Sequence, residues 1–225
     1  MNIGLLVFPE LAQLDLTGPY EVFHRLPGTA VHLVWRDLAP IRAQGGMQLL
    51  PSTTFAECPP LDVVCVPGGF GTRALMTDDV VLAWLRTQAT TARFMTAVCT
   101  GSLVLGAAGL LAGRRATCHW NYVDLLPRLG ATYEAGRVVV DGDRITGGGV
   151  TAGIDLALRV AAELAGDQVA QAIQLGLEYN PEPPFASGHP DVADPAITQV
   201  VRERLAPAKA AIEAIIDASL VRTDA

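Results

Sequence analysis

Residues 94–102 read Phe94-Met95-Thr96-Ala97-Val98-Cys99-Thr100-Gly101-Ser102, an apolar run that meets a cysteine and then a cluster of small residues. The pattern predicts a buried strand over residues 93–98 and a helix from Leu103 to about Leu111, with Gly113 as its stop. Cys99 then lies in a strand-to-helix turn of the kind called a nucleophile elbow. The helix N-terminus points its N–H groups at the sulfur, so we expect it to lower the thiol pKa from the usual value of ~8.5 toward neutrality. A buried core cysteine is the alternative.

The remaining chain alternates β-branched apolar runs with helical stretches, which predicts a doubly wound, mostly parallel α/β sheet with helices on both faces. The expected strands are residues 2–7, 30–35, 62–66, 93–98, 131–133 and 144–146. The expected helices begin near residue 17 and then cover 80–88, 103–111, 153–166, 167–176 and, interrupted at Pro207, 195–218. Between the last two, residues 178–190 predict an extended loop. Ligands bind at the carboxyl ends of strands in such sheets, which is where Cys99 falls.

Composition and charge limit the classes of function that this chain can have. The chain has 225 residues, half of them apolar, which fits one domain over residues 1–225 with a helical extension from about residue 195. A net charge of −7 without a basic run argues against nucleic acid and anionic membranes as partners and favours a small neutral or uncharged substrate. The chain shows no signal sequence, no long apolar span and no paired CxxC spacing. We therefore expect a cytoplasmic protein with reduced thiols.

A glycine-rich turn follows the strand at residues 62–66, with the sequence Pro67-Gly68-Gly69-Phe70-Gly71. Its backbone can approach a ligand closely. The N–H groups of Gly69 and Thr100 are therefore candidates for an oxyanion hole. A tight connection that merely needs positive φ angles is the alternative.

An acidic residue, Asp15, stands between Leu14 and Leu16 after the first strand. A carboxylate among apolar neighbours is costly to bury unless it is paired or protonated. Asp15 is therefore a candidate acid with a raised pKa, and a helix cap is the competing interpretation.

Several segments together resemble the ThiJ/PfpI branch of the class I glutamine-amidotransferase-like superfamily, which implies a flavodoxin-like fold. The resemblance covers nearly the whole chain and is carried by residues 8–9, 15–23, 66–69, 97–102, 116–120 and 148–158. Within this branch, the Asp15 motif and residues 178–185 are most similar to the isonitrile hydratase family. Those enzymes are homodimers that add water to an isonitrile to give an N-substituted formamide.

The resemblance implies a role for each matching residue and requires no metal or organic cofactor. Cys99 is the nucleophile that forms a thioimidate, Asp15 is the acid, and Thr100 orients water or substrate. The neighbouring positions Gly69, Phe70, Thr151, Gly153 and Trp120 are candidates for shaping the pocket. His119 either lines the pocket or has a structural role. Residues 147–153 lack the histidine that glutamine amidotransferases pair with their cysteine, so amide hydrolysis is not expected.

Three alternative functions remain at this level. A glyoxalase-like hydration of small dicarbonyls also uses an activated cysteine, and a histidine relay near the thiol would favour it. A redox sensor would oxidise Cys99 to a sulfinate held by protonated Asp15. The ligand-binding half of a transcription regulator is the third, but this acidic chain ends soon after the expected fold, so we do not expect a DNA-reading module.

Overall fold

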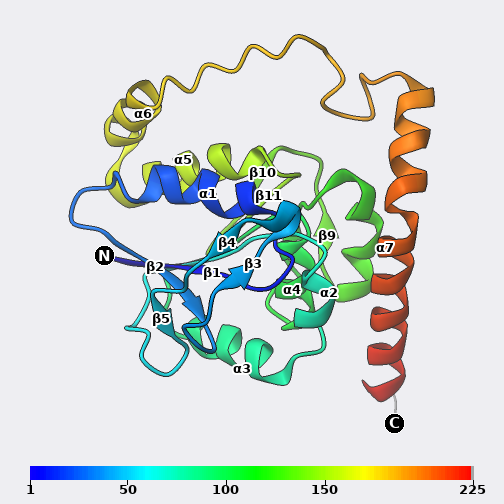
Figure 1. Ribbon diagram of the computed structural model, residues 1–225, viewed down its shortest axis with the longest axis horizontal. Helices are drawn as coiled ribbons and strands as arrows, with labels where there is room; N and C mark the ends of the chain where they lie inside the picture. Colours follow the sequence, from blue (N-terminus) through cyan, green and yellow to red (C-terminus); the bar gives the residue numbers. More distant parts are fainter. Residues whose placement is uncertain (224–225) are drawn as a thin grey trace.

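The computed structural model describes residues 1–223 and is built on a seven-stranded sheet with the order β10-β11-β7-β6-β1-β2-β5 (Figure 1). Six of the strands are parallel, and only the edge strand β10 runs antiparallel. In chain order they are β1 (Asn2–Leu6), β2 (Ala30–Trp35), β5 (Thr53–Thr54), β6 (Val63–Val66), β7 (Phe94–Val98), β10 (Val138–Asp141) and β11 (Arg144–Gly147). The predicted α/β class with a mostly parallel sheet is confirmed.

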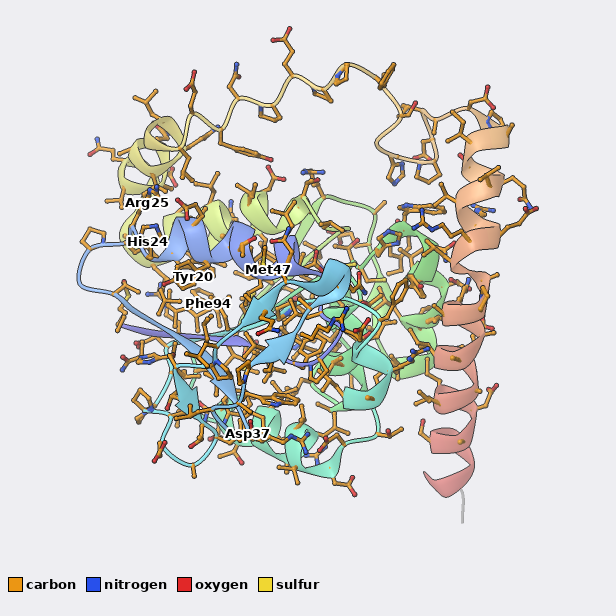
Figure 2. The ribbon with its side chains drawn as sticks, in the orientation of Figure 1. Tyr20, His24, Arg25, Asp37, Met47 and Phe94 are labelled. Atoms are coloured by element: carbon orange, nitrogen blue, oxygen red, sulfur yellow. The ribbon has the colours of Figure 1, made fainter. Side chains whose placement is uncertain are left out.

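Helices cover both faces of the sheet (Figure 1). On one face α1 (Gln13–Phe23) packs against α5 (Ala152–Ala165), and α6 (Asp167–Gly176) packs on α5. On the other face lie α3 (Asp79–Gln88) and α4 (Gly101–Ala107), with the short α2 (Thr72–Leu75) beside α4. Apolar side chains fill both layers, so the sheet is buried on each face (Figure 2).

Smaller elements and one long helix complete the described chain. Two short ribbons pair β3 (Ile41–Arg42) with β4 (Gln48–Leu49) and β8 (Arg115–Ala116) with β9 (Thr132–Tyr133). Three 3₁₀ segments are η1 (Gln44–Gly46), η2 (Trp120–Leu125) and η3 (Pro127–Leu129). The helix α7 (Pro195–Thr223) stands at the side of the molecule and packs on η2 and α2. Within residues 1–223, no helix has the length and apolar character needed to span a membrane.

Several predicted boundaries are wrong. The first helix begins at Gln13 rather than near residue 17, so Asp15 belongs to its first turn and the N-cap is Ala12. The helix after Cys99 ends at Ala107, because Gly109 turns the chain with a φ of 77°. The tail is one continuous helix through Pro207, whose side chain is exposed. Residues 132–133 join the β8 ribbon instead of the main sheet, and the edge strand β10 was not predicted.

The topology brings four segments to one edge of the sheet. Strand β1 lies between β2 and β6, so the chain order reverses beside it, and the carboxyl ends of the parallel strands β1, β6, β7 and β11 share that edge. Leu11 forms an isolated bridge with Gly69, and the N–H of Ala12 donates to the carbonyl of Gly68 over 2.9 Å. A ligand site at such a reversal follows the rule for open α/β sheets.

The close approach of α4 to β6 requires a glycine at position 101. A β-carbon at Gly101 would lie 2.1 Å from the carbonyl oxygen of Val66 and 2.7 Å from that of Pro67, which are both backbone atoms. Gly101→Ala should therefore lower the free energy of unfolding by about 2 kcal/mol. The thermal midpoint should fall by about 4–8 °C in a calorimetric scan.

Gly176→Ala is the matched control, because a β-carbon there meets no atom within 4 Å at the end of α6. Its midpoint should stay unchanged or rise slightly, since alanine favours helix over glycine. Equal midpoints for Gly101→Ala and the wild type would show that this contact does not constrain the fold.

Candidate active site

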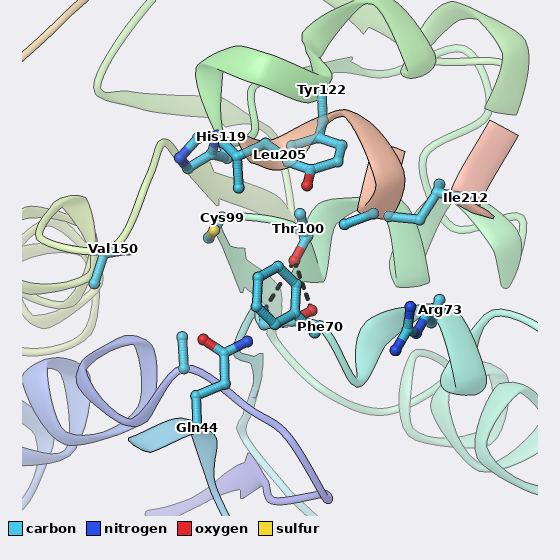
Figure 3. Close-up of a pocket in the computed structure, with 13 residues that line it drawn as sticks. Gln44, Phe70, Arg73, Cys99, Thr100, His119, Tyr122, Val150, Leu205 and Ile212 are labelled. Carbon is cyan, nitrogen blue, oxygen red and sulfur yellow. Dashed lines mark hydrogen bonds between the residues drawn. The ribbon is translucent and has the colours of Figure 1, made fainter. Parts of the chain in front are cut away.

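Cys99 occupies the predicted strand-to-helix turn between β7 and α4. Its φ is 57°, in the left-handed region that residues other than glycine rarely adopt. Two carbonyl groups hold this conformation, because the N–H of Cys99 donates to Gly147 over 3.1 Å and to Gly148 over 2.9 Å. Such backbone strain costs on the order of 1–3 kcal/mol and is typical of functional sites. The side chain is 6% exposed and faces a cavity (Figure 3).

Asp15 lies beside this thiol and is completely buried. One carboxylate oxygen, Oδ2, accepts a hydrogen bond of 2.8 Å from the N–H of Gly68, whereas Oδ1 has no partner among residues 1–223. A β-carbon at Gly68 would lie 2.6 Å from Oδ2 of Asp15 and 2.7 Å from Cβ of Cys99. The Asp15 carboxyl and the Cys99 side chain therefore both pack against Gly68, and a larger residue at position 68 would clash with each of them. No side chain caps α1, so the interpretation of Asp15 as a cap is wrong.

Burial raises the pKa of Asp15 from 3.8 to about 7. The hydrogen bond from Gly68 and the interaction with the Cys99 thiol both oppose this rise, because each favours the ionised carboxylate. The raised pKa that the sequence predicts is confirmed.

The pKa of Cys99 also moves upward, well above its usual 9.0, and the expected shift toward neutrality is wrong. Burial is the larger cause, and the negative charge of Asp15 is the second. The N–H groups of Thr100 and Val150 act in the opposite direction but do not outweigh these two effects. Between the two pKa values, the pair holds one proton as a neutral thiol beside a carboxylate.

Thr100 uses its side chain to hold the glycine-rich turn. Its Oγ1 accepts a hydrogen bond of 3.0 Å from the N–H of Gly69 (Figure 3). That N–H therefore already has an acceptor in this structure, and the oxyanion pair of Gly69 and Thr100 stays a prediction. The donors that favour negative charge on the sulfur are the N–H groups of Thr100 and Val150.

The cavity at Cys99 has a volume of about 160 Å³. Near the thiol it is lined by Thr100, Gly69, Phe70, His119 and Val150. Helix α7 contributes Leu205, Ala208 and Ile212 to the wall, and the remaining polar side chains are Gln44, Arg73 and Tyr122. The site is thus a mostly apolar pocket lined by Cys99, whereas the buried carboxyl of Asp15 is not part of the lining.

A model of the DJ-1/PfpI family matches residues 1–163, which include the elbow, the glycine-rich turn and Asp15. The chain belongs to the DJ-1/PfpI family. It is 58% identical to an isonitrile hydratase from Pseudomonas putida over 207 residues, which are 92% of this chain and 91% of that protein. It is 36% identical to the HTH-type transcriptional regulator CdhR from Pseudomonas aeruginosa over 143 residues, which are 62% of this chain and 42% of the regulator.

A solved structure of a ThiJ/PfpI family protein from Pseudomonas syringae superposes with a TM-score of 0.93 at 39% identity. The match covers 96% of this chain and 90% of the other. The predicted resemblance to this family and its flavodoxin-like fold are confirmed.

Three residues predicted to shape the pocket of this DJ-1/PfpI protein do not line it. Trp120 lies outside, with the guanidinium of Arg202 5.7 Å from its ring centroid. The hydroxyl of Thr151 accepts a hydrogen bond of 3.0 Å from Arg137. Gly153 packs α5 against α1, since a β-carbon there would lie 3.1 Å from Cδ of Pro19.

His119 does line the cavity, and it also has a structural role. Its Nδ1 accepts a hydrogen bond of 3.2 Å from the N–H of Asn121 and so caps η2. Burial lowers the pKa of His119 to about 4. The ring is therefore neutral at physiological pH and is a weak base.

The α7 residues are the main part of the pocket that sequence reasoning missed. Leu205, Ala208 and Ile212 recur at helical spacing on one side of α7, and Ile212 is 4% exposed. The apolar spacing in the sequence predicts that one face of this helix packs against the rest of the protein. The spacing does not predict that this face covers Cys99.

The charge of Asp15 has a measurable effect on the thiol. Because that charge raises the Cys99 pKa, Asp15→Asn should move the midpoint of Cys99 alkylation to lower pH. The rate of iodoacetamide labelling is followed by mass spectrometry of the peptide that carries Cys99. Asp191→Asn, in an exposed loop, is the control and should leave the midpoint in place. A midpoint in Asp15→Asn equal to or above that of the wild type contradicts the coupling.

Proposed function

We propose that this protein is an isonitrile hydratase, which adds water to an isonitrile R–N≡C and releases the formamide R–NH–CHO. The observation that carries the proposal is the pairing of Cys99, a nucleophile that lines an apolar pocket, with the buried carboxyl of Asp15, a proton carrier; both side chains pack against Gly68. The likeness to the Pseudomonas putida enzyme over nearly the whole chain supports the same activity.

The first step joins the thiol to the isonitrile carbon. The Asp15 carboxylate takes the proton of the Cys99 thiol as the sulfur forms its bond to that carbon. Negative charge then develops on the carbon, and Asp15 returns the same proton to it. The product is a thioimidate, R–N=CH–S–Cys99, and the carboxylate is regenerated. The buried setting suits this transfer, because the proton stays between two neighbouring groups.

The second step hydrolyses the thioimidate. Asp15 accepts a proton from water as the water oxygen attacks the thioimidate carbon, and it passes this proton to the nitrogen to give the tetrahedral species R–NH–CH(OH)–S–Cys99. The tetrahedral species then expels the sulfur as the carbon–oxygen double bond forms, and Asp15 transfers the hydroxyl proton to the sulfur. One water molecule is consumed for each formamide released. The N–H groups of Thr100 and Val150 stabilise the departing sulfur while it carries negative charge.

Thr100 has a positioning role in this scheme. Its hydroxyl accepts a hydrogen bond from the N–H of Gly69 and thereby fixes the turn from which Gly68 donates to the Asp15 carboxylate. Its N–H group, which favours negative charge on the sulfur, depends on the same backbone placement.

His119 disfavours the dicarbonyl alternative. A glyoxalase-like reaction would gain from a basic histidine near the thiol, but burial lowers the pKa of His119 to about 4 and Asn121 occupies its Nδ1. Hydration with Asp15 as the proton carrier needs no such base.

The proposal extends to assembly and location. A homodimer is supported by the resemblance to isonitrile hydratases, and the net charge of −7 favours a small-molecule partner over nucleic acid. A cytoplasmic location is supported by Cys58, Cys65, Cys99 and Cys118, which are all free thiols.

Turnover of cyclohexyl isocyanide tests the activity and its residues. The wild type should release N-cyclohexylformamide, and Cys99→Ala should lower kcat by on the order of 10³-fold or more. Asp15→Ala should lower kcat by about 10²–10⁴-fold through loss of proton transfer. Thr100→Ala should lower kcat about tenfold, whereas Thr100→Ser keeps the hydroxyl and should restore most of it.

An inactive wild type whose Cys99 still reacts with iodoacetamide would contradict the hydratase assignment. The dicarbonyl reaction or the redox-sensor function would then be the better interpretation of the site. Full activity in Thr100→Ala would remove the role assigned to that side chain.

The pH dependence tests which partner holds the proton at rest. The scheme needs an ionised Asp15 beside a neutral thiol, so kcat/KM should rise as pH increases through about 7. Below about pH 6 the decline should be about tenfold per unit. A profile that is highest at pH 5 and falls through pH 7 would instead require a resting thiolate with a protonated carboxyl. Circular dichroism at each pH separates these effects from unfolding.

A further inference from the structure

The cavity at Cys99 has two kinds of surface. Leu205, Ala208 and Ile212 of α7 form an apolar wall, while Arg73 of α2 brings a positive charge to the same space. In Figure 3, Arg73 lies on the side of the cavity opposite Val150, and its guanidinium is turned toward Phe70. A ligand that fills this space therefore meets apolar side chains along its body and a cation at one end.

The Arg73 guanidinium has no neutralising partner. No carboxylate among residues 1–223 lies within ion-pair distance of it, and it makes no hydrogen bond to any of those residues. Arg73 is an exposed residue, and Arg86 likewise forms no ion pair with the described residues, so what distinguishes Arg73 is its place in the lining of the cavity. A solvated side chain accounts for its lack of a partner but not for its place in the wall of the catalytic pocket.

The size of the cavity limits the ligand. Its volume is about 160 Å³. An engineered apolar protein cavity of ~150 Å³ holds benzene, so about six heavy atoms fill such a space. Arg73 is an exposed residue, so the end of a longer ligand that reaches it lies at the edge of this space. A carboxylate is small enough to end such a ligand, and the planar guanidinium of arginine matches its two oxygens.

We propose that the preferred substrates are small isonitriles whose apolar substituent ends in a carboxylate, which Arg73 binds while the isonitrile carbon faces Cys99. This inference rests on the proposed hydratase activity. Arg73 is a specificity residue in it and takes no part in proton transfer. The apolar part of such a substrate packs against the α7 side chains, and its carboxylate binds the Arg73 guanidinium. A neutral alkyl isonitrile gains only the first of these interactions.

The test compares matched substrates. Isonitriles with two to five methylene groups, ending in either a carboxylate or a methyl group, are assayed for formamide production, and the ratio of kcat/KM within each pair is measured. The wild type should favour the carboxylate by about fivefold at one or more lengths, the upper range for a solvated ion pair. Arg73→Gln should remove this preference, and Arg73→Lys should keep part of it.

Arg86→Gln supplies the matched control, because Arg86 is an exposed arginine on α3 that does not line the cavity. It should retain the wild-type ratio. Added salt at 0.5 M should shrink the ratio in the wild type but not in Arg73→Gln.

Two results would overturn the inference. One is a wild type that favours the methyl partner at every length, and the other is an Arg73→Gln variant that keeps the carboxylate preference. Both leave the hydratase proposal intact as long as the neutral isonitriles are converted. If no isonitrile of either kind yields formamide, the hydratase proposal fails and this inference fails with it.

Discussion

The close packing of a buried carboxyl against a buried thiol is the constraint on which the rest of this structure depends. Asp15 is completely buried, and its carboxyl and the Cys99 side chain both pack against Gly68, where a β-carbon would clash with each of them. Because the folded pKa of about 7 exceeds the usual 3.8, the fold prefers the protonated carboxyl. The associated stability is fully present below about pH 3.8 and is lost as pH rises through about 7, an effect on the order of 4 kcal/mol. The glycine-rich turn, the first turn of α1 and the Cys99 elbow are the elements that hold the two groups together.

This packing also explains why a helix N-terminus does not by itself produce a thiolate here. The N–H groups of Thr100 and Val150 favour negative charge on the sulfur, but burial and the nearby carboxylate favour the neutral thiol more strongly. The donors therefore have their largest effect when charge arrives during a reaction, once the proton has left the thiol. A pair that shares one proton can deliver it to a substrate carbon and recover it from water without a metal or a histidine. His119 lines the cavity in its neutral form, which is consistent with a reaction in which Asp15 and Cys99 carry the proton.

The parts of the site that the sequence predicts are those encoded by short local patterns. Cys99 follows an apolar run and precedes small residues, and Asp15 stands between two leucines, so the elbow and the raised carboxyl pKa were both predictable. The depth at which Cys99 is buried was not predictable from these patterns, and the shift of its pKa was therefore predicted in the wrong direction. His119 and Trp120 are adjacent in sequence, yet only the first lines the cavity, because η2 turns the second toward Arg202. Side-chain direction in a 3₁₀ segment depends on tertiary packing rather than on motif.

The cavity wall was beyond sequence prediction for a related reason. Leu205 and Ile212 lie more than a hundred positions after Cys99, and only the packing of α7 on η2 and α2 brings them to it. Cys99 and Asp15, the proposed reacting groups, lie within residues 1–163, the part that matches the DJ-1/PfpI family, whereas this wall lies outside it. The α7 part of the cavity wall and the thiol–carboxyl pair thus come from different segments of the chain, so substitutions along α7 alter the wall at positions outside the segments that hold Gly68, Asp15 and Cys99. Arg73, the proposed specificity residue, lies instead on α2, within the part that matches the family.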